Sequence, residues 1–390
     1  MTPHERLYTA IAGGVPDRVP VVPKIWVDLA AALTGTDLRR VVEDPMAAMR
    51  VIVDAGMDLG VDGVRVFHFP PRLTEARDGA LYEVNSRGRT LGVIDTGGGL
   101  ATRLEDAADY RLDDPVTMSY HNFWDAPEPP VRSVADVARI AIPDGQLFDE
   151  LGWGDRLRAV ADEAVERTTL IGDCSSATFG FYIYLRGGME RAMLDVLDEP
   201  KLVHAGMEKG VAIAVAKGKY AIDQGLRILR LNDSVANMSV MSPTHWREFV
   251  FPHMKTVCDE LHAYDSDVLI YCHICGNVLP VLEPLVETGV DCIAPLDPLG
   301  GFTPGDARAV VGDSVSLMGG VDTLSFVNEP PLAVLEESRR CIDEAGRNGG
   351  FVLGSGCVIP RTARRDCIEA HVMAAREFGT YTDGTLDIGQ

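Results

Sequence analysis

A histidine and two cysteines occur where their side chains could meet. His273 and Cys275 stand two residues apart at the end of an apolar run, and Cys357 follows a second apolar run at a glycine-rich turn. Alternate side chains of a β-strand share a face, so the first two residues should point the same way and Cys272 the other. One imidazole and two thiolates are ligands that zinc favours, and three protein ligands leave a fourth position open. We therefore predict a catalytic zinc site made of these three residues.

This ligand set favours thiol alkylation over hydrolysis. Two thiolates and a neutral imidazole bring a zinc site to zero net charge, and sulfur ligands make the metal a modest Lewis acid. A substrate thiol in the fourth position would become a thiolate, because coordination lowers its pKa. Sites built from histidine and glutamate are more electrophilic and suit the activation of water instead. A lone cysteine in a strand is usually a small buried hydrophobic residue. The prediction of a metal site therefore depends on the ends of two strands lying close together.

Eight short β-rich runs, most of them followed by a helical pattern, must position these ligands. The runs are 18–23, 61–67, 169–174, 226–231, 268–275, 291–296, 314–318 and 351–353. Several are continuously apolar, as expected for parallel strands buried on both faces. We predict an α/β fold, a (β/α)8 TIM barrel in one domain over residues 1–390, with an N-terminal helical extension and a β-hairpin insertion within 80–104. The ligands then lie at the carboxyl ends of the fifth and eighth strands, where barrels of this type place their active sites.

Composition excludes several classes of protein. The 390 residues carry a formal charge of −22, which disfavours nucleic acid and anionic membranes as partners. No apolar run reaches the roughly 18–20 residues of a membrane span, and the N-terminus lacks the features of a signal peptide. Eight cysteines are too few for a disulfide scaffold. We expect a cytoplasmic enzyme with reduced thiols.

Longer motifs surround the metal ligands in a fixed order. Residues 273–277 lead into 282–291, preceded by 232–234 and 241–243 and followed by 317–322 and 354–357. Their order and spacing resemble the uroporphyrinogen decarboxylase superfamily, specifically its cobalamin-dependent methyltransferase branch, over nearly the whole chain. The resemblance implies a (β/α)8 barrel with zinc on His273, Cys275 and Cys357. It also implies methyl transfer between a corrinoid protein and a thiol such as coenzyme M.

Two departures from family patterns bear on the cofactor and the substrate. Decarboxylases of this superfamily hold a polycarboxylated tetrapyrrole with arginines just after the first strand, whereas residues 23–29 contain none here. A polyanion without such partners would be hard to hold. The cobalt-binding Asp-x-His-x-x-Gly motif of corrinoid domains is also absent. Cobalamin would therefore arrive on a separate corrinoid protein or as the free cofactor.

Weaker candidates follow the other strands. Family position suggests that Asp233 lies at the pocket, as a catalytic residue that orients substrate or approaches the zinc; capping of a helix or loop is the alternative. Asn232, Trp26 and Phe179 are predicted to contact the cofactor. The two aromatic residues would form an apolar wall for a flat corrin, together with Phe67, His68 and Tyr182, although aromatic residues at strand ends are as often plain packing.

Four functions stay open at this point. The first is a zinc-dependent methyltransferase that moves a methyl group between a corrinoid and a thiol or other small acceptor. The second is a corrinoid-dependent demethylase, which transfers the methyl group in the opposite direction, from a small methylated ether or thioether to the corrinoid. The third is a metal-free lyase such as a decarboxylase, which leaves the three ligands unexplained. The fourth is a non-catalytic protein stabilised by zinc, which normally requires four protein ligands, with Asp233 or Cys272 to supply the last.

Overall fold

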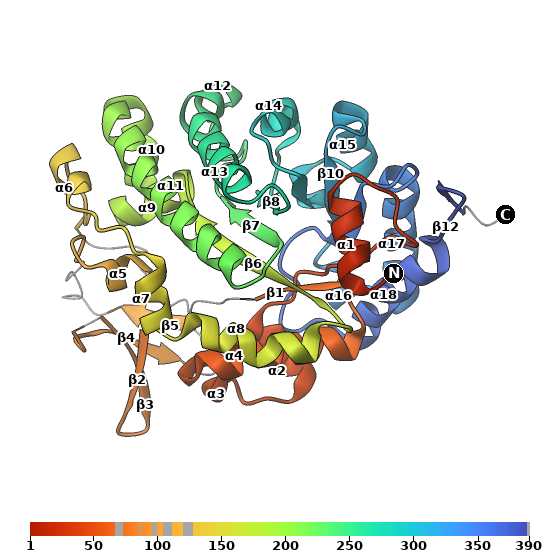
Figure 1. Cartoon of the computed structure of the whole chain (residues 1–390), viewed down its shortest axis with the longest axis horizontal. Coiled ribbons are helices and arrows are strands. Elements are labelled where there is room, and N and C mark those ends of the chain that lie inside the picture. The colour runs from red at the N-terminus through yellow and green to blue at the C-terminus, as the bar shows by residue number, and fades with distance from the viewer. Residues whose placement is uncertain (67–72, 86, 96–99, 104–110, 120–127, 388–390) are drawn as a thin grey trace.

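A parallel sheet of seven strands forms the core of the molecule (Figure 1). The computed structural model describes residues 1–66, 73–85, 87–95, 100–103, 111–119 and 128–387. The strands of the sheet, in order, are β1 (Gly63–Arg65), β6 (Thr169–Ser176), β7 (Ile228–Asn232), β8 (Leu269–His273), β9 (Cys292–Leu296), β10 (Ser316–Val321) and β11 (Phe351–Ser355). All neighbouring pairs are parallel, so every carboxyl end lies at the same rim.

The segment that precedes β1 closes the sheet into a barrel. Val21 forms an isolated parallel bridge to Leu353 on β11, and the N–H of Asp62 donates to the carbonyl of Val21 (2.9 Å). Pro20 and Pro23 have no N–H to donate, so this segment makes no continuous ladder. The predicted (β/α)8 barrel is confirmed, with its first predicted strand reduced to this bridge.

Helices form the outer layer and follow the strands as predicted. The first part of the chain contributes α1 (Pro3–Ile11), α2 (Val27–Thr34), α3 (Leu38–Glu43), α4 (Pro45–Leu59), α5 (Pro115–Ser119), α6 (Val134–Ala138), α7 (Gly145–Glu150) and α8 (Trp153–Ala164). After β6 come α9 (Phe179–Arg186), α10 (Met189–Asp198), α11 (Pro200–Asp223), α12 (Pro243–His245), η1 (Trp246–Val250), α13 (Phe251–Tyr264), η2 (Leu279–Val281), α14 (Leu282–Glu287), η3 (Pro298–Gly300), α15 (Pro304–Val311), α16 (Ser325–Asn328), α17 (Pro331–Ala345) and α18 (Arg365–Phe378). The chain ends with a small hairpin, β12 (Tyr381–Thr382) and β13 (Thr385–Leu386).

The helix predicted after β7 contains one irregular turn. Ser242 caps its start by accepting the N–H of His245 (3.2 Å). The following turn, η1, is a π-helix, and Pro252 stands just beyond it. Because a proline inside a helix offers no N–H to the carbonyl four residues earlier, the wider turn accommodates the missing bond.

The N-terminal helix α1 closes the amino end of the barrel. Thr2 and Glu5 form a capping box at its start, which satisfies two backbone N–H groups. Its apolar face, Leu7 with Ile11, is buried against inward side chains of the strands, among them Ile228. This is the predicted N-terminal helical extension, and its packing completes the lower core of the barrel.

An antiparallel sheet of four strands is inserted after β1. Its strands are β2 (Leu73–Arg77), β3 (Ala80–Val84), β4 (Thr90–Asp95) and β5 (Leu100–Arg103). The turn between β3 and β4 is held by Asn85, whose side-chain oxygen accepts the N–H groups of Arg87 and Arg89. The predicted hairpin is confirmed as the β3–β4 pair, while residues 86, 96–99 and 104 of the predicted range lie outside the described residues.

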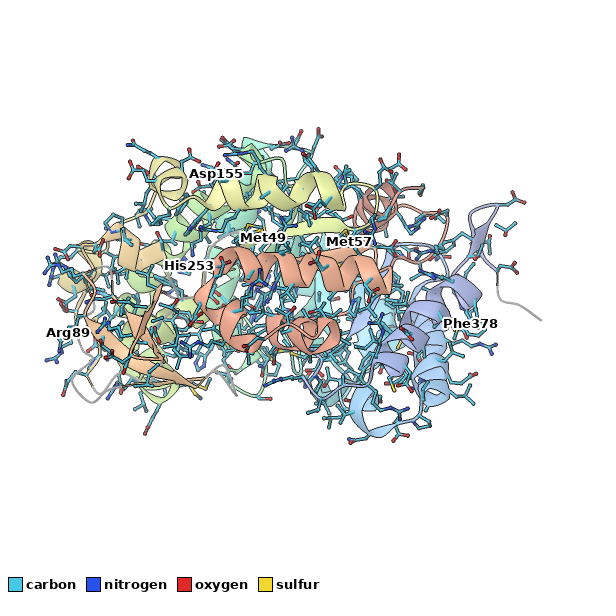
Figure 2. All side chains as sticks on the ribbon, turned by 90° about the horizontal axis from the view of Figure 1, so that it is seen from below. Met49, Met57, Arg89, Asp155, His253 and Phe378 are labelled. Atoms are coloured by element: carbon cyan, nitrogen blue, oxygen red, sulfur yellow. The ribbon has the colours of Figure 1, made fainter. Side chains whose placement is uncertain are left out.

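On the outside of the barrel, α4 and α8 pack side by side (Figure 2). Met49 of α4 is buried beneath them, whereas Asp155 of α8 lies in solvent. Each helix therefore covers the sheet with one apolar face. Among the residues that the structure describes, no helix combines the length and the apolar character that crossing a lipid bilayer requires.

Candidate metal centre

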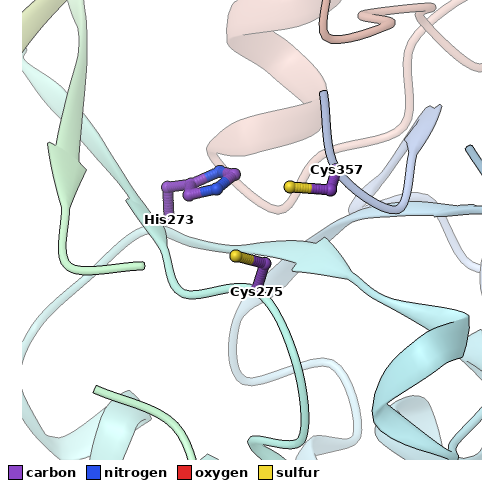
Figure 3. Close-up of side chains that lie close together, drawn as sticks. All are labelled: His273, Cys275 and Cys357. Carbon is purple, nitrogen blue, oxygen red and sulfur yellow. The ribbon is translucent and has the colours of Figure 1, made fainter. Parts of the chain in front are cut away.

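Three ligand side chains predicted from the sequence converge at the carboxyl rim of the barrel. His273 is the last residue of β8, Cys275 lies in the turn that follows, and Cys357 lies two residues beyond β11. Their ligand atoms are all within 4.8 Å of one another, and Figure 3 shows the imidazole and the two sulfur atoms facing a common point. Residues more than eighty positions apart thus form one cluster.

Hydrogen bonds fix the two turns that carry the cysteines. The carboxylate of Asp297 accepts the N–H of Gly276 (2.8 Å), directly after Cys275. The hydroxyl of Ser355 donates to the carbonyl of Cys357 (2.6 Å) and accepts the N–H of Lys24 (2.9 Å). Both sulfur atoms are therefore held by backbone contacts that do not depend on a metal.

Glycine is required beside Cys357 for steric reasons. A Cβ on Gly356 would lie 2.5 Å from a ring carbon of Pro298, closer than such atoms approach. Cys272, by contrast, faces outward from the barrel, where its thiol contacts the sulfur of Met254 (3.6 Å). Cys272 is therefore not placed to supply a fourth ligand.

The protonation states suit a metal. Burial, followed by the charge of Lys24, holds the pKa of His273 well below its ordinary value, so the imidazole is neutral. The hydrogen bond from Cys275 lowers the pKa of Cys357 to about 6, and the same contact raises the pKa of Cys275. A thiolate, its partner thiol and a neutral imidazole form a donor set that fits zinc, which would replace the proton held between the sulfur atoms.

Asp233 lies near the cluster, but its carboxylate is hydrogen-bonded to the start of a helix. Its two carboxylate oxygens accept the N–H groups of Phe179 (2.9 Å) and Gly180 (2.8 Å) at the start of α9. Burial raises its pKa to about 7, although these two bonds act against the rise. Of the two interpretations of Asp233, the structure shows the helix cap.

The other predicted contacts divide into two groups. Asn232 is next to His273 in the strand register and its amide donates to Ser176 (3.0 Å), so it lies at the rim. The ring of Trp26 is 39% exposed and lies 5.2 Å from the guanidinium of Arg65. Phe179, however, is completely buried among the core side chains, and its predicted contact with the cofactor stays a prediction. Its position just after a strand could not reveal that the ring points into the core.

Two further members of the predicted aromatic wall give no support to it. Tyr182 is completely buried and its hydroxyl donates to Asp195 (2.7 Å). Phe67 and His68 lie outside the described residues. Of the proposed wall, Trp26 alone among the described residues offers an exposed ring.

Sequence reasoning missed a basic group inside the barrel. Arg65 on β1 and Arg230 on β7 are both buried and lie on either side of Asp173 from β6. The amine of Lys24 lies 2.5 Å and 3.1 Å from the two imidazole nitrogens of His273. The available signal was a charged residue within an otherwise apolar strand, as in Val64–Val66 and Leu229–Leu231.

This basic group changes one sequence argument. The absence of arginine in residues 23–29 predicts that a polyanionic substrate would be hard to hold. Arg65 and Arg230 nevertheless bring guanidinium groups into the barrel from other strands, while burial holds the pKa of Lys24 well below its ordinary value. Residues 23–29 alone underlie that expectation, so it stays a prediction.

Fold and site together define a (β/α)8 barrel protein with metal-binding side chains at the carboxyl rim of its strands. The family model described as "Uroporphyrinogen decarboxylase (URO-D)" matches residues 116–378. The chain belongs to the uroporphyrinogen decarboxylase family, which confirms the resemblance read from the sequence. The match includes every strand of the barrel except β1.

Relatives of this chain carry two different activities in their names. A uroporphyrinogen decarboxylase of Pelodictyon phaeoclathratiforme is 29% identical over 54% of this chain, and the match spans only 59% of that protein's length. A methylated-thiol–coenzyme M methyltransferase of Methanosarcina mazei is 27% identical over 65% of this chain and 67% of its own. The solved structure of a methyltransferase from Methanosarcina mazei superposes over 97% of this chain and 99% of its own, with a TM-score of 0.70 at 16% identity, which shows the shared fold.

Proposed function

We propose that this protein is a zinc-dependent methyltransferase that moves a methyl group between a corrinoid and a small thiol. The observation that carries the proposal is the convergence of His273, Cys275 and Cys357 within 4.8 Å. A decarboxylase needs no such cluster, whereas thiol alkylation uses a sulfur-rich metal site with one open position. The similarity to a protein named as a methylated-thiol methyltransferase supports the type of reaction.

Each side chain has a defined part in this activity. His273, Cys275 and Cys357 would hold the ion, with His273 neutral so that its lone pair is available. When bound, zinc would supply a fourth position in which a substrate thiol loses its proton near neutral pH. Ser355 and Asp297 keep the two cysteine turns in place, so little rearrangement is needed to form the site.

The corrinoid is the second substrate in this proposal, carried by a separate protein or free in solution. In the forward direction the substrate thiolate attacks the methyl carbon. A sulfur–carbon bond forms as the cobalt–carbon bond breaks, and the electron pair of the broken bond stays on cobalt. The protein contributes position and ionisation, which account for most of the rate enhancement expected of such a transfer.

Metal content is the first test. Purified protein should contain about one zinc per chain, and the His273→Ala and Cys357→Ala variants should lose it while keeping their secondary structure. Cys272→Ala is the matched control, because that thiol faces away from the cluster and its removal should leave zinc in place. Methyl transfer from methylcobalamin to thiols, followed by the change in the cobalamin spectrum, then tests the reaction. Protein that contains no zinc and takes none up would contradict the proposal.

A metal-free decarboxylase is the second candidate, because the buried arginines favour an anionic substrate and several relatives carry that name. It predicts loss of carbon dioxide from a polycarboxylated substrate without zinc. Activity that survives both chelation and the Cys357→Ala substitution would favour it over methyl transfer.

A further inference from the structure

Strand β6 contains an irregular step where it pairs with β7, close to the metal centre. The register shifts between Asp173, which pairs with Arg230, and Ser175, which pairs with Leu231, so Cys174 is an extra residue. Such a β-bulge turns the side chains that follow it to the other face of the sheet, and bulges are common next to active sites. The bulge therefore decides which side chains of β6 reach the interior of the barrel.

Residues on both sides of the bulge face the interior. Arg230 donates to the carboxylate of Asp173 (2.7 Å), and the amide of Asn232 donates to the hydroxyl of Ser176 (3.0 Å). His273, the register partner of Asn232, lines a small cavity inside the barrel, so this face of the sheet points inward. Asp173 and Ser176 are three residues apart, and a regular strand would turn them to opposite faces. Ser176 therefore reaches Asn232 because of the bulge.

Ser175, at the bulge, has a backbone conformation that is unfavourable for its residue type. Its φ is 70°, in the left-handed region. The other described non-glycine residues with a positive φ are Asp78 and Asp383, and each precedes a glycine in a hairpin turn, where this conformation is ordinary. Ser175 instead lies within a strand of the barrel, where its N–H donates to the carboxylate of Asp173 (2.7 Å). Strain of this kind persists where the surroundings impose it, and it is frequent at functional sites.

Lys217 on α11 holds the bulge from the outer layer of the barrel. Helix α11 packs against β6, and the amine of Lys217 donates to the hydroxyl of Ser175 (2.9 Å). The lysine side chain is completely buried, and burial lowers its pKa to about 7. Placing an amine in the core costs stability, and so does the backbone conformation of Ser175. Two local costs at one bulge near the metal centre indicate a role in function rather than in stability.

The orientation of the Asn232 amide is the consequence of the bulge inside the barrel. The amide nitrogen donates to Ser176 and the amide oxygen accepts from Arg230, so both ends of the group are fixed. An amide nitrogen carries two hydrogen atoms, and Ser176 accepts one of them. Asn232 is partly exposed at the rim and lies beside His273 in the strand register. Its second N–H is therefore placed to bind a ligand that approaches the metal centre.

We propose that Lys217 is a positioning residue for the proposed methyl transfer: its bond to Ser175 maintains the bulge that orients the amide of Asn232. This inference rests on the proposed function, since the ligand assigned to Asn232 is the corrinoid. The edge of a corrin ring carries amide side chains, and their carbonyl oxygens accept a bond of this kind. Lys217 contacts neither the corrinoid nor the metal, and it acts through Ser175 and Ser176.

The test is binding of methylcobalamin to the purified protein, measured by isothermal titration calorimetry. Lys217→Met removes the amine and keeps an apolar side chain of similar length, and it should raise the dissociation constant about three- to tenfold, the effect of one lost hydrogen bond. The midpoint of urea unfolding should stay the same or rise, because a buried amine is removed, and the zinc content should not change. Lys219→Met is the matched control. Lys219 is partly exposed on the same helix and pairs with Glu260 (3.4 Å), so its removal should leave the affinity intact.

Two further variants locate the effect. Asn232→Ala and Ser176→Ala should weaken binding of methylcobalamin by a similar factor. The double variant Lys217→Met/Asn232→Ala should bind no more weakly than Asn232→Ala, because the amine acts through the amide. In a transfer assay these variants should raise KM for methylcobalamin more than they lower kcat. Ser176→Ala leaves the buried amine in place, so it tests the same route even where Lys217→Met does not fold.

The outcomes separate this inference from the proposed function. The inference is overturned if Lys217→Met binds methylcobalamin as the wild type does, whatever its stability, or if the losses of affinity add in the double variant. A wild-type protein that binds no methylcobalamin overturns it as well. Each of these results leaves methyl transfer from a corrinoid on a separate protein standing. A loss of affinity shared by Lys217→Met and Asn232→Ala, without methyl transfer to any thiol, upholds the placement of the amide by Lys217 and contradicts the methyltransferase.

Discussion

Among the described residues, two groups each place one buried aspartate between two arginines, and they differ in the lengths of their ion pairs. The lower arginine group is Asp62 with Arg6 and Arg18, near the amino ends of the strands. Asp62 accepts bonds from Arg6 (2.7 Å) and Arg18 (2.9 and 3.0 Å), as well as the N–H of Val21 (2.8 Å). A second carboxylate, Asp17, pairs with Arg6 at 2.6 Å, so two acids face two bases.

The upper arginine group, Asp173 with Arg65 and Arg230, has the same residue types. Asp173 pairs with Arg230 at 2.7 Å, but its ion pair with Arg65 is long at 3.7 Å. The lower group joins α1 to the start of the barrel, whereas the upper group borders the cavity beside His273. The comparison teaches that one combination of residues can hold two segments of the fold together with short ion pairs or border a cavity with a longer one.

Removing the acid of the lower group should have the largest effect. Asp62→Asn leaves Arg6 and Arg18 facing a neutral amide in a site where Asp62 is 1% exposed. We expect the free energy of unfolding to fall by about 3–5 kcal/mol, the range for breaking a buried ion pair. Urea unfolding followed by circular dichroism measures it. Stability within about 1 kcal/mol of the wild type would show that the lower group is not structural.

The acid of the upper group should stabilise the fold in a pH-dependent way. Burial alone would raise the pKa of Asp173, but Arg230 and Arg65 lower it to about 2. The folded pKa lies below the unfolded value of about 3.9, so this stabilisation is present above about pH 4 and is lost as the pH falls toward 2.

Asp173→Asn removes that contribution, which is on the order of 2 kcal/mol near neutral pH. The difference in unfolding free energy between wild type and variant should therefore shrink as the pH is lowered from about 5 to 3. Unfolding in urea at a series of pH values measures this difference. A difference in unfolding free energy that stays constant across the series would mean that the two arginines do not lower the pKa of Asp173.

The long ion pair of the upper group should contribute less stability than the short pairs of the lower group. Arg65→Met removes a buried charge and leaves Asp173 with its closer partner, Arg230. We expect the free energy of unfolding to fall by no more than about 1 kcal/mol, because the Arg65–Asp173 distance is 3.7 Å. The matched change in the lower group, Arg6→Met, should destabilise the protein. Equal destabilisation by the two substitutions would remove the distinction between the groups.

The smallest effect should come from Trp26, whose ring lies against Arg65. A cation–π contact at a partly exposed site contributes about 0.5–1 kcal/mol. Trp26→Ala should therefore lower the free energy of unfolding by about 0.5–1 kcal/mol, measured by urea unfolding. Weaker binding of methylcobalamin by this variant would instead favour the predicted contact between this ring and the corrinoid.

The sequence predicted the cluster of metal-ligand side chains because its spacing reports on strand geometry. A histidine and a cysteine two apart must share a face, and the ends of parallel strands must meet at one rim. The buried arginines were missed because a charged residue in an apolar run does not reveal its partner on another strand. Only the register of β6 and β7 brings Arg230 to Asp173.

Errors in the remaining predictions have local causes. The segment 18–23 has the composition of a strand, but its prolines limit it to a bridge. Phe179 also follows a strand, but its ring is buried in the core while its backbone N–H donates to Asp233 at the start of α9. The hydrophobic pattern alone reveals neither the short bridge nor the direction of the ring.

The hydroxyl of Ser355 joins the Lys24 segment, near the start of the barrel, to Cys357, near its end. The turn that carries Cys357 therefore takes its place only after the first and last segments of the barrel have come together. Zinc bound as proposed would link the turn after β8 to the turn after β11, so these two turns would separate less readily in the metal-bound protein.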